Sequence, residues 1–232
     1  MHTGKATART LGALFIIATV AAALSVAVLN PLLDDPDYLL NLSADESGVV
    51  LGTLLDLVTA AAVIGIGVMF FPVLRQSSEG LALGYAAARI IEGAVIVVGA
   101  LSSLLLLTLS QEFVQASALD APGFQPLGDV LLAARDWTDI LGTVIAFGVS
   151  AVILNFLLYK TRLVPRFLSV WGLAGAALLL VAGLLGLSGE SPTATPMLLL
   201  ALPIAVNEMV LALWLIIKGF NPSAATARPA TG

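Results

Sequence analysis

Long apolar segments separated by short polar ones run from one end of the chain to the other. The first, from Leu11 to Leu29, is a run of nineteen residues without a charge. A helix rises about 1.5 Å per residue, so a helix of this length can cross a hydrocarbon core about 30 Å thick. Five comparable segments follow. The pattern predicts six transmembrane helices, at about residues 11–29, 49–74, 81–109, 130–160, 167–187 and 197–217.

The first apolar segment also allows a second interpretation, a cleaved signal peptide. The alanines at positions 21–23 would then form the small-residue cleavage site. Secretory apolar cores are usually about 7 to 15 residues long, which is shorter than this segment. We therefore expect the segment to be retained as the first helix.

The polar connections carry several local signals. Ser43 and Glu46 have the spacing of a capping box at the start of the second helix. Residues 111–128 are expected to form a loop with a short interfacial helix, and Pro196 is placed to open the sixth helix. Residues 221–232 are rich in Ala, Thr and Pro and are expected to be a disordered cytoplasmic tail.

Basic and acidic residues are divided unequally between the two sets of connections. With six helices, the segments on the side of the N-terminus hold Lys5, Arg9, Arg75, Lys160, Arg162, Arg166, Lys218 and Arg228. The opposite segments hold Asp34, Asp35, Asp37, Asp45, Glu46, Glu112, Asp120 and Glu190, with Arg135 at a helical border. Short cytoplasmic loops retain Lys and Arg, so both termini are predicted to lie in the cytoplasm, with the chain in the cell membrane.

Composition agrees with this placement and excludes much familiar chemistry. Hydrophobic residues make up 59% of the chain and charged residues 11%, against about 25% charge in ordinary soluble domains. We therefore expect an all-α, polytopic transmembrane bundle that forms a single domain over residues 1–220. The chain has no cysteine, and its one histidine is His2. These counts argue against thiolate or histidine metal sites and a serine-histidine relay, so we expect no metal and no cofactor. We expect the lipid bilayer, and no nucleic acid, as a partner.

A few ionisable side chains nevertheless fall within the predicted spans, where each is costly and should find a partner. Counting from the cytoplasmic helix ends, Arg89 lies about 12 Å deep and Glu208 about 14 Å deep, so the two can meet. Glu92 lies one turn from Arg89 on the same face, as does Tyr85, and Asn207 can add a neutral hydrogen bond. These five residues form a predicted inner polar cluster.

A second polar group is expected in the outer half of the bundle. Asp56 lies roughly 10 Å from the outer end of the second helix. Arg135, Asp136 and Asp139 fall at a similar level at the start of the fourth. These four residues form a predicted outer polar cluster.

The clusters allow more than one functional interpretation. They can line a cavity that binds a lipid or small amphiphile or passes protons, or they can only fix which helices pack together. A membrane-embedded enzyme would use Glu92, Glu208 or Asp136 on a lipid-like substrate, although any bundle with ion pairs offers such a set. An accessory subunit would use Gly172 and Ala176 of the fifth helix to pack on a larger partner. A homo-oligomer or a larger membrane complex is compatible with each interpretation.

Three segments resemble a known family. They are Ala88–Gly93 (ARIIEG), Leu158–Gly175 (LYKTRLVPRFLSVWGLAG) and Leu202–Phe220 (LPIAVNEMVLALWLIIKGF). The chain resembles bacterial membrane proteins of the domain of unknown function 4386, from the first helix to Phe220. The resemblance implies a multi-helix membrane protein without an assigned activity, and it carries over no catalytic residue.

Overall fold

Helices account for nearly all of the computed structural model, which describes residues 2–116, 123–189 and 195–221. No strand occurs in these ranges. The helix that begins at Phe124 is continuous, with a π-helical stretch (η2) between α5 and α6. The elements are α1 (His2–Leu33), α2 (Tyr38–Ala44), α3 (Glu46–Leu74), α4 (Glu79–Gln115), α5 (Phe124–Thr138), η2 (Asp139–Ala146), α6 (Phe147–Thr161), α7 (Arg166–Leu187) and α8 (Thr195–Ile217).

Six of these helices are long and apolar enough to cross a membrane, as the sequence pattern predicts. They are Gly4–Leu33, Glu46–Leu74, Glu79–Gln115, Phe124–Thr161, Arg166–Leu187 and Thr195–Ile217. Each contains a window whose mean hydropathy is between 2.2 and 2.5. The chain is therefore an integral, multi-pass membrane protein.

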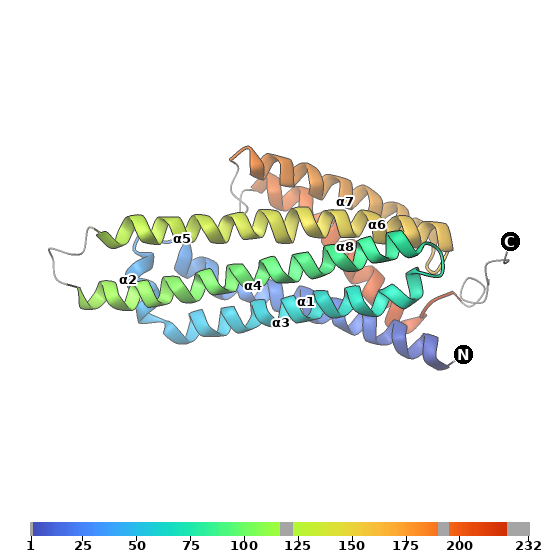
Figure 1. The fold of residues 1–232 in the computed structure, drawn as a ribbon, viewed down its shortest axis with the longest axis horizontal. Coiled ribbons are helices and arrows are strands. Elements are labelled where there is room, and N and C mark those ends of the chain that lie inside the picture. The colour runs from blue at the N-terminus through green and yellow to red at the C-terminus, as the bar shows by residue number, and fades with distance from the viewer. Residues whose placement is uncertain (1, 117–122, 190–194, 222–232) are drawn as a thin grey trace.

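The helices run side by side in one elongated bundle (Figure 1). The start of α1 and the end of α8 lie at the same end of it, together with the α3–α4 and α6–α7 turns. We call this end, which carries all the described Lys and Arg residues except Arg89 and Arg135, the basic end. The opposite end is called the outer end.

The core at the basic end is built around aromatic rings. Phe70 of α3 makes edge contacts with Phe15 of α1, Tyr85 of α4 and Phe220, at centroid distances of 6.2, 5.8 and 6.1 Å. All but Phe220 are almost fully buried. This packing holds α1, α3 and α4 together next to the inner cluster.

Small residues of α7 let its neighbours approach closely, but these neighbours belong to the same chain. A Cβ on Gly175 would lie 2.9 Å from the backbone nitrogen of Ile204 on α8. A Cβ on Gly172 would collide with the side chain of Asn155 on α6, and Ala176 is fully buried. The small-residue face of α7 is thus occupied inside the bundle.

The two helices α7 and α8 cover only part of the bundle's length. α4 has 37 residues and α7 has 22, or about 55 Å against about 33 Å at the usual rise. Near the outer end of α7, a Cβ on Gly186 would lie 3.1 Å from Ile140, the second residue of η2. In Figure 1, α5, α2 and the last turns of α4 extend past the end of α7.

Some local predictions at the outer end are wrong. Ser43 lies within α2, a seven-residue helix that the pattern does not predict, so it forms no capping box with Glu46. Asp45 caps α3 instead, because it directly precedes the helix and accepts a hydrogen bond of 3.0 Å from the Gly48 nitrogen. The expected loop at 111–128 is shorter, since α4 continues to Gln115 and α5 begins at Phe124. Of the expected tail, residues 222–232 lie outside the described part.

Candidate functional site

The inner cluster is centred on Arg89 of α4, whose side chain is 2% exposed. Its Nη2 atom donates a hydrogen bond of 2.9 Å to Oε1 of Glu208 on α8. Its Nη1 atom lies 3.1 and 3.2 Å from the two carboxylate oxygens of Glu92 on the same helix. The guanidinium group therefore joins α4 to α8 across a sequence separation of 119 residues.

Aromatic groups complete the surroundings of Arg89. Its Nε atom donates to the hydroxyl of Tyr85 over 3.3 Å. The rings of Phe147, Phe15 and Tyr85 lie 4.9, 5.7 and 5.8 Å from the guanidinium carbon, which is the range of cation–π contacts. Groups from α1, α4, α6 and α8 thus meet at one cation, and every nitrogen of its guanidinium group has a partner.

The inner cluster contains two carboxylates for one guanidinium. The Glu92 side chain is 6% exposed and that of Glu208 is 15% exposed. Glu208 is therefore the member that lies nearest to the surface of the bundle.

Asn207 does not join this group. Its Nδ2 atom donates to the carbonyl oxygen of Leu168 on α7, over 2.9 Å. Consecutive residues of a helix point in different directions, so Asn207 faces α7 while Glu208 faces Arg89. The expectation that Asn207 donates within the inner cluster is wrong, and its contact ties α8 to α7 instead.

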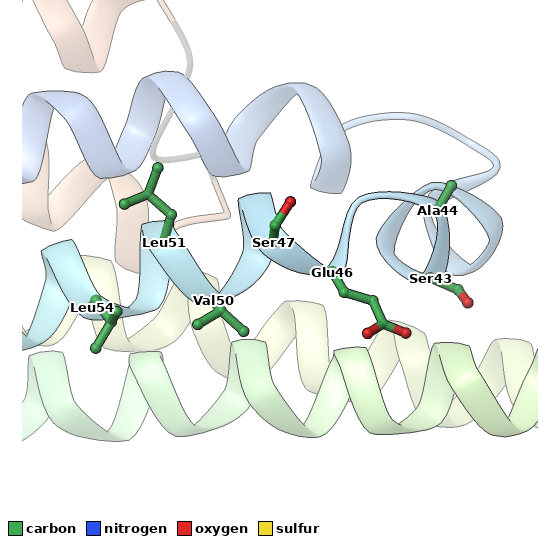
Figure 2. Close-up of a pocket in the computed structure, with 7 residues that line it drawn as sticks. All are labelled: Ser43, Ala44, Glu46, Ser47, Val50, Leu51 and Leu54. Carbon is green, nitrogen blue, oxygen red and sulfur yellow. The ribbon is translucent and has the colours of Figure 1, made fainter.

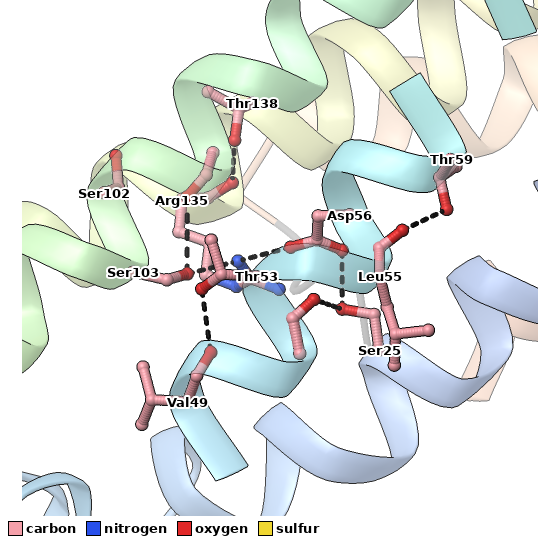
Figure 3. Close-up of polar contacts among 12 residues, drawn as sticks. Ser25, Val49, Thr53, Leu55, Asp56, Thr59, Ser102, Ser103, Arg135 and Thr138 are labelled. Atoms are coloured by element: carbon pink, nitrogen blue, oxygen red, sulfur yellow. Dashed lines mark hydrogen bonds and ion pairs between the residues drawn. The ribbon is translucent and has the colours of Figure 1, made fainter. Parts of the chain in front are cut away.

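The outer cluster joins α3, α4 and α5 through Arg135 (Figure 3). Nη1 of Arg135 lies 3.3 Å from Oδ2 of Asp56 and 2.6 Å from the hydroxyl oxygen of Ser103. The Ser25 hydroxyl of α1 lies 2.5 Å from Oδ1 of Asp56 and 3.1 Å from the Gly52 carbonyl oxygen, so it can donate to either. The cluster therefore links four helices, as the inner one does.

The sequence interpretation missed Ser25 and Ser103. Both are small polar residues in otherwise apolar runs, and both are 1% exposed. A hydroxyl in such a run can bond the backbone of its own helix, so its presence alone does not reveal a contact between helices. Their positions at the level of Asp56 and Arg135 were the available signal.

The structure does not bring Asp136 and Asp139 into this hydrogen-bonded network, and Asp139 interacts with Arg135 and Asp56 only through the electrostatic field. Asp136 is exposed on α5 and Asp139 is half-buried at the start of η2. Neither makes an ion pair within 4.0 Å or a hydrogen bond through its carboxylate among the described residues. Asp136 follows Arg135 directly and so points elsewhere, while Arg135 reaches across to α3 rather than along its own helix.

A further polar contact joins α2, which lies outside the six candidate spans, to the start of the span that begins at Phe124. The Tyr38 hydroxyl of α2 donates to Oδ1 of Asp129 on α5 over 3.0 Å. Burial, together with the hydrogen bond and negative charge of Asp129, raises the pKa of Tyr38 to about 12. This contact fastens α2 onto the first turns of α5.

Two surface hollows lie at opposite ends of the bundle, and no residue of either polar cluster lines them. The outer hollow, whose lining residues are drawn in Figure 2, is wide and shallow and has a volume of about 680 Å³. The inner hollow has a volume of about 20 Å³ and lies between α1 and α8 at the basic end. The outer hollow is lined by Ser43, Ala44, Glu46, Ser47, Val50, Leu51 and Leu54.

Metal binding gains no support from the described side chains. Among them, no three of His, Cys, Asp and Glu come together in a group that could hold an ion.

Comparison with known proteins gives one result. No curated protein matches the chain, and no solved structure does. The family model described as "Domain of unknown function (DUF4386)" matches residues 10–219, which includes both polar clusters and all six candidate spans in whole or in large part. The chain belongs to the family of the domain of unknown function 4386.

Proposed function

We propose that the chain is a non-catalytic membrane module that binds an amphiphilic molecule of the bilayer in the outer hollow. The observation that carries this proposal is the change in the lining along α3. Ser43, Glu46 and Ser47 lie at the α2–α3 corner, and the apolar lining residues continue along α3 as far as Leu54 (Figure 2). From Glu46 to Leu54 the helix rises about 12 Å, along which an acyl chain can lie.

The polar part of the outer hollow favours a headgroup that carries an ammonium group. Oε1 of Glu46 accepts a hydrogen bond of 2.8 Å from Gln111 of α4. The neighbouring Asp45, whose carboxylate caps α3, accepts a hydrogen bond of 3.1 Å from Ser47, which lines the hollow. Neither carboxylate has a cationic partner within 4.0 Å among the described residues. An ammonium group complements this charge, while a headgroup that is only anionic is repelled.

The polar clusters support a packing role better than a chemical one. Catalysis by a carboxylate needs an open pocket, yet the side chain of Glu92 is 6% exposed and lines neither hollow. Transport needs a polar path that opens to both sides of the membrane. Side chains of the chain itself enclose Arg89, so a ligand or ion could reach the inner cluster only after these side chains move. Binding at the surface requires no such rearrangement.

The alternative role as an accessory subunit rests on a free small-residue face of α7. Gly172 and Gly175 of that face already contact α6 and α8. A partner would therefore have to use the apolar outer surfaces of the bundle, which lipid also covers. Assembly into an oligomer or larger complex remains a prediction.

Lipid retention tests the proposed function. The protein would be placed in nanodiscs with equal amounts of phosphatidylethanolamine and phosphatidylglycerol, and the lipids retained after release would be weighed by native mass spectrometry. We expect Glu46→Gln to reduce retained phosphatidylethanolamine several-fold, because it removes the carboxylate nearest the proposed ammonium group.

Glu112→Gln is the matched control, since it removes one exposed carboxylate at the same end without lining the outer hollow. It should leave retention unchanged. Equal retention by the Glu46→Gln variant and the unmodified protein would contradict the proposal, as would an equal loss in the control.

We also infer that the protein sits in the cell membrane with the basic end in the cytoplasm. Seven exposed or half-exposed cations mark that end among the described residues. The bias of Lys and Arg toward cytoplasmic segments supports this orientation. A protease added outside intact cells should then cleave a site inserted at residue 119 and spare one fused after Gly232.

A further inference from the structure

The first turns of α1 and the end of α8 lie against each other at the basic end. A Cβ on Gly219 would lie 3.8 Å from Cγ of Lys5 and 3.9 Å from Cβ of Ala8. Further along α1, a Cβ on Gly12 would lie 2.6 Å from the carbonyl oxygen of Ala212. The two helices are therefore in direct contact over several turns.

The inner hollow lies in this contact and gathers three cations. Lys5 and Arg9 are four residues apart and so share one face of α1. Lys218 directly follows the last residue of α8. A volume of about 20 Å³ holds roughly one water-sized group, such as one oxygen of a phosphate, with the rest of the group above the surface.

These three cations have no partner within the described part of the chain. Lys5, Arg9 and Lys218 make no ion pair within 4.0 Å, no side-chain hydrogen bond and no contact with an aromatic ring there. The sequence of residues 1–3 and 222–232 contains no Asp or Glu. No carboxylate side chain from these terminal segments can therefore neutralise the group.

Other cations at the basic end are placed differently. Arg75 lies over the ring of Phe71 at 5.9 Å, and Arg166 lies over the ring of Tyr159 at 5.0 Å. Each has a partner within its own corner of the bundle. The trio beside α8 is the group that converges on a hollow.

The backbone at the end of α8 fixes Lys218 beside the hollow. The nitrogen atoms of Lys218 and Gly219 both donate to the carbonyl oxygen of Trp214, over 2.8 and 3.1 Å. Gly219 has φ of 75°, a conformation that glycine adopts without strain and that ends the helix here. Lys218 is therefore held at the helix end rather than in a free tail.

Apolar surface adjoins the charges. Ile217 is 70% exposed and Leu213, one turn earlier, is 51% exposed. A soluble anion buries no apolar surface against these side chains, whereas the acyl chain of a bound lipid would bury some and so add to the binding free energy. The site thus combines three cations with an apolar wall at the point where a span ends.

We propose that Lys5, Arg9 and Lys218 bind the phosphate headgroup of an anionic phospholipid in the leaflet at the basic end. The site is separate from the outer hollow and takes an anionic lipid rather than one whose headgroup carries an ammonium group. Cation-to-phosphate hydrogen bonds are strong because both partners are charged.

The same nanodisc experiment tests this site through its second lipid, phosphatidylglycerol. The triple variant Lys5→Gln, Arg9→Gln, Lys218→Gln should retain about tenfold less phosphatidylglycerol, since each removed cation weakens attraction to an anionic headgroup. Retention of phosphatidylethanolamine should not change, so the result is distinct from the test of Glu46. Detergent-purified protein enters a nanodisc without a choice of orientation, which removes any effect of charge on insertion.

The control is the triple variant Arg75→Gln, Lys160→Gln, Arg162→Gln, which removes the same charge from the same end. It should retain most of the phosphatidylglycerol. A second variant, Lys5→Arg with Lys218→Arg, keeps the charge and should retain as much as the unmodified protein. Equal losses in the two triple variants would overturn the proposal. Displacement of the lipid by millimolar inorganic phosphate would also overturn it, because the site would then bind a free anion.

Discussion

Arg89 and Glu208 are 119 residues apart in sequence, yet Nη2 of the arginine lies 2.9 Å from Oε1 of the glutamate. The arginine is almost fully buried and Glu208 is its partner on another helix. An isolated charge at this depth is costly, so the pair favours one arrangement of α4 and α8 over others. Asn207, the residue directly before Glu208, adds a neutral hydrogen bond to α7. α8 is thereby tied to two helices at one level.

The two glutamates of the inner cluster should differ in their effects. Glu208→Gln removes the charge that joins α8 to α4, whereas Glu92→Gln alters a contact within α4. Both changes replace a carboxyl group with an amide and leave the side-chain shape almost unchanged. We expect faster amide hydrogen exchange in α8 for Glu208→Gln and near-normal exchange for Glu92→Gln. The reverse order would show that the contact between helices is the weaker of the two.

Arg135 should stabilise the outer half of the bundle as Arg89 stabilises the half at the basic end. Arg135→Ala leaves Asp56 with only the hydroxyl of Ser25, and we expect a loss of about 3 kcal/mol in the free energy of unfolding. Asp136→Asn is the control, because that side chain is exposed, and it should cost less than about 0.5 kcal/mol. Unfolding of both variants can be followed by circular dichroism in mixed micelles. A loss below 1 kcal/mol for Arg135→Ala would contradict a locking role for this cluster.

The close contact of α7 with α8 gives a test of packing. A Cβ at Gly175 would lie 2.9 Å from the nitrogen and 3.0 Å from Cα of Ile204, and backbone atoms cannot yield as a flexible side chain can. Gly175→Ala should therefore destabilise the bundle by about 1 to 3 kcal/mol. Gly80→Ala is the matched control, since nothing lies within 4 Å of its added Cβ. It should be neutral or slightly stabilising in the first turn of α4.

Tyr38 gives a prediction about pH. The pKa of its phenol is raised to about 12 by burial and by Asp129, whereas an unfolded tyrosine titrates near 10. Its contribution to stability is therefore complete below pH 10 and is lost as the pH rises through 12, because the unfolded chain releases this proton first. The tyrosinate absorbance of the unmodified protein minus that of Tyr38→Phe should rise near pH 12. A rise near pH 10 would mean that the phenol is not held against Asp129.

The sequence predicts the six spans and the ion pair between α4 and α8, but it does not predict how far each helix extends. The six spans can be predicted because each apolar run, as a helix, is long enough to cross a membrane. The Arg89–Glu208 contact can be predicted because the two charges lie at similar depths in their helices. Both signals are strong because membrane burial of a charge or exposure of an apolar run to water is costly. The extension of α4 and α5 past α7 could not be read from hydropathy, since apolar residues continue into it.

The direction in which each polar side chain points is harder to predict from the sequence than its depth. Depth alone predicts that Asn207 lies with Arg89 and Asp136 with Asp56. Neighbouring residues of a helix point in different directions, however, so Glu208 faces the inner cluster and Asn207 does not, and Arg135 faces the outer cluster and Asp136 does not. The short α2 is held by contacts that are distant in sequence, such as the hydrogen bonds from Tyr38 to Asp129, 91 residues away, and from Ser110 to the Leu39 carbonyl, 71 residues away. Such contacts are set by the packing of whole helices and leave no local signal in the sequence.

A double-mutant cycle on Arg89 and Glu208 tests the locking role of the inner cluster most directly. Arg89→Leu, Glu208→Leu and the double variant would be unfolded in mixed micelles and their free energies compared. We expect the double variant to lose at least about 1 kcal/mol less than the sum of the two single losses, because either single change already removes the Arg89–Glu208 contact, which the sum therefore counts twice. Losses that add to within about 0.5 kcal/mol would show that the two residues do not hold α4 and α8 together.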